Sequence, residues 1–249
     1  MTKEQYISTL TPEILRLTTD ACKSCNGSGY TIVKIKEENY DYETEKAREC
    51  ECVRIRKLKA MGLEERYQEC CLANYNVDDS NKDVYSTIKL FIDKYPNVKN
   101  GILIMGGCGT GKTYTAATII NEAVWKTQTS HARMISVPKL LEEIKATYDS
   151  KAKRKLREME FDLTEIEKCE LLCIDDLGAE HLKEGDGASW IREKLFLIID
   201  SFWNRKKTII VTTNCTVKDI EDKYGDRVMD RIRGMTVQRV ITGKSRRML

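Results

Sequence analysis

The chain has 249 residues, little net charge, only two histidines and no long apolar run. No apolar segment approaches the roughly 20 residues that a membrane-spanning helix needs, which argues against a membrane protein. The start of the chain is polar and charged, so we expect no signal peptide, a cytoplasmic location and no membrane partner. A formal net charge of +3 is too small to indicate nucleic-acid binding by itself.

Cysteine, in contrast, is abundant, with ten residues. In a reducing compartment, paired cysteines more often indicate a metal site than a disulfide. Cys22 and Cys25 form a Cys-x-x-Cys that is followed by Asn-Gly-Ser-Gly, and Cys50 and Cys52 supply a second pair. Four thiolates can close a tetrahedral Zn²⁺ site, which would be structural because no coordination position stays open.

Two alternatives to this ligand set remain. In the first, the four cysteines bind no metal and are free structural cysteines. In the second, other cysteines take part as ligands. Cys70 and Cys71 are weaker ligand candidates, because adjacent cysteines fit poorly onto one ion. No histidine ligand is expected, since His131 and His181 lie far downstream.

Residues 1–75 are predicted to form a small zinc-binding module, because they contain too little apolar material to fold without such a staple. A short helix is expected after Thr11, and the alternation in 30–35 predicts a strand. Residues 53–61 form a basic helical stretch that Gly62 ends. Its basic face either contacts nucleic acid or an acidic partner, or is simply solvated.

A phosphate-loop motif dominates the rest of the chain, and it lies between an apolar run of strand type at 101–105 and a helical pattern at 114–125. Such a strand, glycine turn and helix start direct several backbone N–H groups at one point, which suits a phosphate. Lys112 would reach the β- and γ-phosphates, and Thr113 would offer its hydroxyl to Mg²⁺. The alternative is a glycine-rich turn without a ligand. The predicted nucleotide-binding residues are Gly106, Gly107, Cys108, Gly109, Thr110, Gly111, Lys112, Thr113 and Tyr114.

The apolar run 171–174 ends in Asp175 and Asp176, which is the companion signature of a phosphate loop. Asp175 would hold Mg²⁺ through water, and Asp176 would polarise the attacking water. The buried-type run 209–213 ends in Asn214, which would face the γ-phosphate at the carboxyl edge of a parallel sheet. Its alternative role is the N-cap of a following helix.

Arginines gather near the carboxyl terminus. Arg227 and Arg231 are four residues apart and therefore share one face of a predicted helix, where Asp230 offers either of them an ordinary ion pair. The repeated strand–loop–helix pattern predicts a three-layer α/β domain with a parallel sheet over residues 76–249. A dense Lys/Arg run at 151–157 is the strongest local basic cluster.

The chain resembles the AAA+ replicative helicase loaders of the DnaC/DnaI type, with the IstB-like ATP-binding proteins as kin. The resemblance rests on five motifs in this order: the cysteine knuckle, the phosphate loop, Ile-Asp-Asp-Leu-Gly, Thr-Thr-Asn and Asp-Arg-Val-Met-Asp-Arg-Ile-Arg. The resemblance implies that Asn214 is sensor 1, that Arg231, with Arg227 beside it, is the arginine finger, and that Arg247 is sensor 2. It also implies ATP/ADP as ligand, a spiral homo-oligomer with ATP at its interfaces, single-stranded DNA at its centre, and a hexameric helicase bound by the zinc module. Two departures are the missing zinc-site histidine and a very short C-terminal lid.

Three functions compete at this point. The first is an ATP-dependent loader that delivers a replicative hexameric helicase onto single-stranded DNA, with slow hydrolysis that depends on assembly and DNA. The second is an IstB-like transposition helper that binds duplex DNA, and the third is an NTP-binding adaptor without a DNA role. The zinc module favours the first, and the basic run 151–157 argues against the third.

Overall fold

The computed structural model describes residues 22–36, 43–127, 131–140, 142, 166, 168–179 and 186–246. The chain divides into two compact units, Met1–Gln68 and Glu69–Leu249, here called the N-terminal and C-terminal units. The predicted boundary after residue 75 stays a prediction. Three features predicted from the sequence lie outside the described residues, namely the helix after Thr11, the basic run 151–157 and Arg247.

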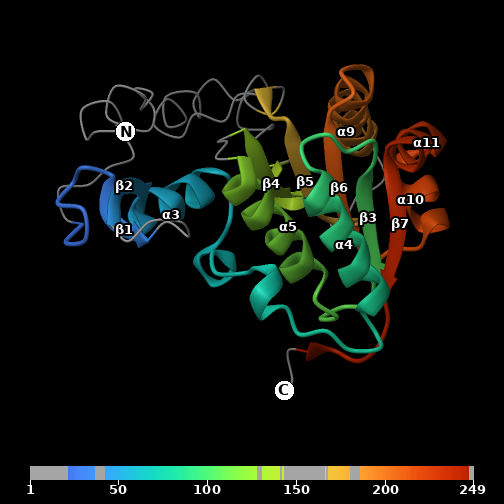
Figure 1. The fold of residues 1–249 in the computed structure, drawn as a ribbon. Coiled ribbons are helices and arrows are strands. Elements are labelled where there is room, and N and C mark those ends of the chain that lie inside the picture. The colour runs from blue at the N-terminus through green and yellow to red at the C-terminus, as the bar shows by residue number, and fades with distance from the viewer. Residues whose placement is uncertain are drawn as a thin grey trace. The chain divides into compact units, whose positions relative to one another are not determined.

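The N-terminal unit consists of a two-stranded ribbon and a helix. Strands β1 (Tyr30–Lys36) and β2 (Glu43–Glu49) pair antiparallel, and α3 (Glu51–Ala60) and the 3₁₀ turn η1 (Glu65–Tyr67) follow (Figure 1). The strand and the basic helix predicted from the sequence are present, whereas β2 was not predicted. Within residues 22–36 and 43–68, and apart from two of the cysteines, the buried apolar side chains are few: Tyr30, Val53, Leu58, Met61 and Leu63.

The C-terminal unit is built on a five-stranded sheet of order β4-β5-β6-β3-β7, in which every neighbouring pair is parallel. The strands are β3 (Gly101–Gly106), β4 (Ala132–Ser136), β5 (Leu171–Leu177), β6 (Thr208–Thr213) and β7 (Thr236–Ile241). The runs singled out in the sequence at 101–105, 171–174 and 209–213 form β3, β5 and β6, whereas the order of the strands was not predicted. Because parallel strands need crossover connections, helices cover both faces of the sheet.

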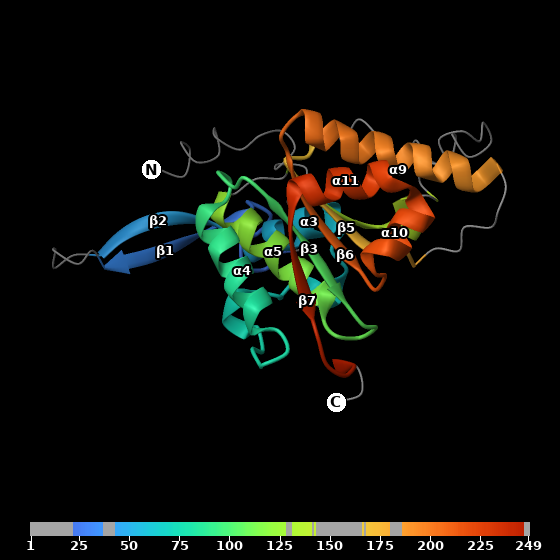
Figure 2. The same ribbon diagram turned by 90° about the vertical axis from the view of Figure 1, so that its right-hand side faces the viewer.

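The helices of this unit form two layers. On one face lie α4 (Lys82–Lys94) and α5 (Lys112–Thr127), and on the other lie α9 (Asp186–Asn204), α10 (Val217–Tyr224) and α11 (Asp226–Met235) (Figure 2). Successive residues of β3 serve opposite layers, since Leu103 joins the core under α9 and α11 while its neighbours turn to the other face. The predicted three-layer α/β architecture is confirmed.

The helix boundaries follow local sequence rules. The apolar side chains of α4 recur at Val84, Ile88 and Phe91, and all three are buried as this helical spacing predicts. Thr216 caps α10 by accepting a hydrogen bond from the amide of Asp219, whose carboxylate accepts one from Thr216 N in return. Among the helices in the described part of the chain, none is both long and apolar enough to span a bilayer.

Candidate nucleotide site and metal centre

The phosphate loop lies between β3 and α5, as predicted. Its first glycine, Gly106, packs so closely on β7 that a Cβ there would lie 2.5 Å from the carbonyl oxygen of Ile241. Only glycine fits this position, because the clash is with the backbone. The loop therefore enters α5 along a fixed path, with the amide groups of the first helical turn available to an anion.

The side chain of Lys112 is folded back over this loop. It is buried, and its Nζ donates a hydrogen bond to the carbonyl oxygen of Gly107 over 2.8 Å. Thr110 Oγ1 donates to the same oxygen over 3.0 Å. The ammonium group thus lies against the phosphate loop, where it could reach the β- and γ-phosphates of a nucleotide.

Three side chains from three elements meet beside the loop. Thr113 Oγ1, in the first turn of α5, lies 3.2 and 3.1 Å from the two carboxylate oxygens of Asp175 at the end of β5. Thr212 Oγ1 in β6 donates to Asp175 Oδ1 over 2.6 Å. A hydroxyl and a carboxylate are the oxygen ligands that Mg²⁺ prefers, so Thr113 and Asp175 fit the ion predicted for them.

The carboxylates of the Asp-Asp pair sit on a β-bulge. The register between β5 and β6 shifts between Ile174 and Leu177, and Asp176 adopts a positive φ of 54°. The amide of Asp176 donates to Thr212 Oγ1 over 2.9 Å, so a single hydroxyl fixes both aspartates. Bulges commonly redirect side chains at functional sites. Thr212 has a role that the sequence analysis missed.

Burial raises the pKa of Asp175, and the charge of Asp176 adds to this effect. Hydrogen bonds from Thr212 and Thr113 and the charge of Lys112 oppose it without cancelling it. A bound divalent cation would act in the same direction as Lys112 and favour the ionised carboxylate.

Asn214 follows β6 directly and is exposed, with its Oδ1 near the Cys215 thiol at 3.7 Å. The helix N-cap is Thr216, so the alternative capping role of Asn214 is not observed. Thr213 holds the strand end in place by donating to the carbonyl oxygen of Leu177 over 2.6 Å. The Asn214 side chain therefore stands at the carboxyl edge of the sheet, on the β6 strand that neighbours both β3 and β5.

The arginines of α11 differ in their surroundings. Arg227 is exposed and forms no hydrogen bond or ion pair with the described part of the chain. Arg231 Nε donates to Asp200 Oδ1 in α9 over 2.9 Å, and its Nη1 lies 3.6 Å from Asp230. The ordinary ion pair with Asp230 is thus present but long, and the main partner, Asp200, was not predicted from the sequence.

The chain segment after β7 returns to the phosphate loop. The amide of Arg246 donates to the carbonyl oxygen of Gly109 over 2.9 Å, and its guanidinium binds Asp78 over 2.6 Å and Ser80 over 3.1 Å. Sensor 2 is expected at Arg247, which lies outside the described residues, and its neighbour Arg246 is the arginine that the structure describes at the loop.

Residues before α4 also contact the start of α5. Tyr75 Oη lies 2.7 Å from Thr115 Oγ1, and Tyr114 Oη donates to Asn74 Oδ1 over 2.9 Å. Residues 69–75 therefore pack on the helix that carries the phosphate loop. The predicted nucleotide residue Tyr114 is engaged in this contact.

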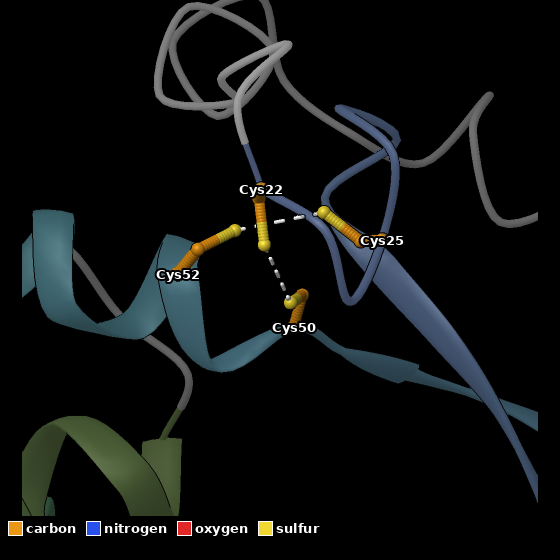
Figure 3. A group of neighbouring side chains, drawn as sticks. All are labelled: Cys22, Cys25, Cys50 and Cys52. Carbon is orange, nitrogen blue, oxygen red and sulfur yellow. Dashed lines mark hydrogen bonds between the residues drawn. The ribbon is translucent and has the colours of Figure 1, made fainter.

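The four predicted zinc ligands converge in the N-terminal unit (Figure 3). Cys22 and Cys25 belong to the turn before β1, and Cys50 and Cys52 to the start of α3. All four sulfur atoms lie within 4.8 Å of one another, with Sγ–Sγ distances of 3.7 Å for Cys22–Cys50 and 3.6 Å for Cys25–Cys52. These distances are too long for disulfides, which join sulfurs at about 2.05 Å. They match the S–S separation of about 3.8 Å that follows from tetrahedral Zn–S bonds of about 2.3 Å.

The thiols of this cluster have strongly unequal proton affinities. The amide of Cys25 and the thiol of Cys52 lower the pKa of Cys22 to about 6. Burial raises the pKa of Cys50 and of Cys52. A cation would replace the protons on all four sulfurs, so this chemistry and this geometry both fit Zn²⁺.

Comparisons with solved structures support the architecture. The crystal structure of the DnaC helicase loader has a TM-score of 0.58 and 24% identity, covering 72% of this chain and 99% of that one. DnaI gives a TM-score of 0.60 and 25% identity, covering 75% of this chain and 95% of that one. The replication initiator DnaA bound to AMPPCP and single-stranded DNA gives 0.55 and 23%, covering 74% and 52%. The P-loop AAA+ fold expected from the sequence is confirmed.

The sequence comparison identifies the family. No curated protein matches the chain closely enough to count as a relative. The family described as IstB-like ATP binding protein matches residues 35–247, which include the phosphate loop, the Asp-Asp pair and the arginines of α11. Because this match spans most of the sequence, the chain belongs to the IstB-like ATP-binding protein family.

Proposed function

We propose that this protein is an ATP-dependent loader that delivers a replicative hexameric helicase onto single-stranded DNA. The observation that carries the proposal is the pairing of a AAA+ unit with a separate unit that holds a four-cysteine cluster. A module that a bound metal stabilises would give the ATPase a partner-binding domain that does not depend on the nucleotide site. The likeness to the DnaC helicase loader and to DnaI supports the same role.

In this proposal ATP occupies the phosphate loop, with Lys112 at its phosphates. Thr113 and Asp175 hold Mg²⁺, which neutralises phosphate charge when bound. Asp176 orients and polarises the attacking water, and Asn214 contacts the γ-phosphate from the end of β6. ATP then acts as a switch: its binding strengthens the contacts with DNA and helicase, and slow hydrolysis weakens them again.

Arg231 supplies the remaining charge from a neighbouring subunit. An Arg231→Ala variant is expected to bind ATP with almost unchanged affinity, while assembly-dependent hydrolysis falls by about three orders of magnitude, as for other arginine fingers. The measurement is steady-state phosphate release over a range of protein concentrations, together with ATP titration. Hydrolysis at the normal rate would refute the assignment. Arg233→Ala is the matched control, because Arg233 lies on the same helix and pairs with Glu221 in its own subunit.

A second candidate function is a transposition helper that binds duplex DNA, which the IstB-like family match supports. The full-length protein with ATP should distinguish the two. A loader should bind single-stranded DNA more tightly than a duplex of equal length and should co-elute with a purified replicative hexameric helicase. Preference for the duplex without helicase binding would move the assignment to the transposition helper.

A further inference from the structure

Two side chains near the end of α9 contact the guanidinium of Arg231, and a third holds one of these two in place. Asp200 Oδ1 accepts the hydrogen bond from Arg231 Nε over 2.9 Å, and Asp200 Oδ2 accepts one from Asn204 Nδ2 over 2.8 Å. The guanidinium also lies over the Trp203 ring, 5.1 Å from its centroid. We call Asp200, Trp203 and Asn204 the Arg231 seat.

The seat is itself fixed against α11. A Cβ on Gly234, one turn after Arg231, would lie 2.5 Å from the Trp203 ring, so the indole packs directly on the helix backbone at this point. Asn204 orients the Asp200 carboxylate from the next turn of the same helix. Each group that touches the guanidinium is therefore held by a second contact, as a preorganised site requires.

The seat leaves the outer part of the guanidinium available. Asp200 engages Nε, the nitrogen closest to the chain, whereas Nη2 forms no hydrogen bond within the described residues. The side chain of Arg231 is 32% exposed, so the charge is neither withdrawn into the core nor fully mobile. A guanidinium that is fixed at Nε and stacked on an aromatic ring keeps its remaining donors in one direction.

We infer that Asp200 and Trp203 are positioning residues that orient Arg231 for the neighbouring subunit's γ-phosphate. This inference rests on the proposed role of Arg231 in trans and adds to it the groups that set its geometry. Flexible arginines lose side-chain entropy when they reach a ligand, and the seat removes much of this loss before subunits meet. The competing explanation is an ordinary ion pair that only packs α9 against α11.

Mixed assemblies separate the two explanations. A Lys112→Ala chain retains Arg231 but cannot use ATP, and an Arg231→Ala chain binds ATP but offers no finger. Mixing the two full-length proteins with ATP and single-stranded DNA should restore hydrolysis at the interfaces that combine them. Asp200→Asn is then added to one chain or to the other.

Asp200→Asn on the Lys112→Ala chain should lower the restored hydrolysis by about tenfold to a hundredfold, as expected for a misplaced catalytic group. The same substitution on the Arg231→Ala chain should have no effect, because that chain donates no finger. Asp230→Asn on the Lys112→Ala chain is the matched control, since Asp230 lies 3.6 Å from Arg231 and is 76% exposed. Thermal unfolding of each variant reports any purely structural effect.

Three results would overturn the inference. If Asp200→Asn acts equally from both chains, or acts only by lowering the unfolding temperature, the seat is a packing contact and the inference fails. If it raises hydrolysis from the Lys112→Ala chain, the seat restrains Arg231 rather than orienting it. If the mixture restores no hydrolysis even without Asp200→Asn, the trans role of Arg231 in the proposed function is wrong and the inference falls with it.

Discussion

Lys112→Ala is expected to weaken ATP binding by about a hundredfold or more, which corresponds to about 3 kcal/mol. The reason is geometric as well as electrostatic, because the ammonium group is buried and already lies over the loop at Gly107. Titration of the full-length protein with a fluorescent ATP analogue measures the change. The fold should persist, since Thr110 still donates to the carbonyl oxygen of Gly107 in the variant.

Lys89→Ala provides the control for this experiment. Lys89 is an exposed lysine on α4, and its removal changes the net charge by the same amount. An equal loss of affinity in both variants would mean that general charge, rather than the phosphate loop, attracts the nucleotide. An affinity within twofold of the wild type for Lys112→Ala would exclude this loop as the nucleotide site.

Loss of the metal is expected to unfold the N-terminal unit while the C-terminal unit still binds ATP. The purified protein should contain about one Zn²⁺ per chain, and Cys50→Ser should remove it. Structural zinc sites contribute about 10 to 16 kcal/mol in zinc-finger peptides, which is as large as the whole stability of many domains. The few apolar side chains buried in the described part of this unit, residues 22–36 and 43–68, are too small a core to replace such a contribution.

Metal analysis and limited proteolysis measure the two parts of this prediction. Proteolysis of Cys50→Ser should remove the N-terminal unit and leave a resistant C-terminal fragment. Cys71→Ser is the matched control and also tests the weaker ligand candidates, because Cys71 lies outside the cluster. Zinc retained by Cys50→Ser, or lost from Cys71→Ser, would show that the ligand set has been assigned wrongly.

Local patterns were sufficient to predict most of the C-terminal unit. The spacing of Val84, Ile88 and Phe91 is that of one face of a helix, and the glycines with Lys112 and Thr113 predicted the strand–loop–helix around them. The two cysteine pairs could be assigned to one metal site from the sequence, because a tetrahedral site needs four ligands and no histidine lies nearby in the sequence. In these cases the structure is determined either by residues that are close in the sequence or by the ligand number that a metal requires.

Other features depend on contacts that no local pattern contains. Strand β2 was missed because its ribbon has no fully buried face, so Glu43–Glu49 shows no apolar alternation. The order of the sheet depends on which crossovers pack best, and the partner of Arg231 is Asp200, 31 residues away. The role of Thr212 appears only when β6 lies beside the bulge of β5.

The hydroxyl of Thr212 has a consequence for how the fold distributes its stability. It accepts from the Asp176 amide and donates to Asp175, so the Asp175 carboxylate and the backbone of Asp176 are in place before any cation arrives. Folding must therefore desolvate the Asp175 carboxylate, as the raised pKa of Asp175 records. The hydrogen bond from Thr212 offsets part of this cost, and nucleotide with its cation would offset more of it, so ligand binding and resistance to unfolding are coupled at Asp175.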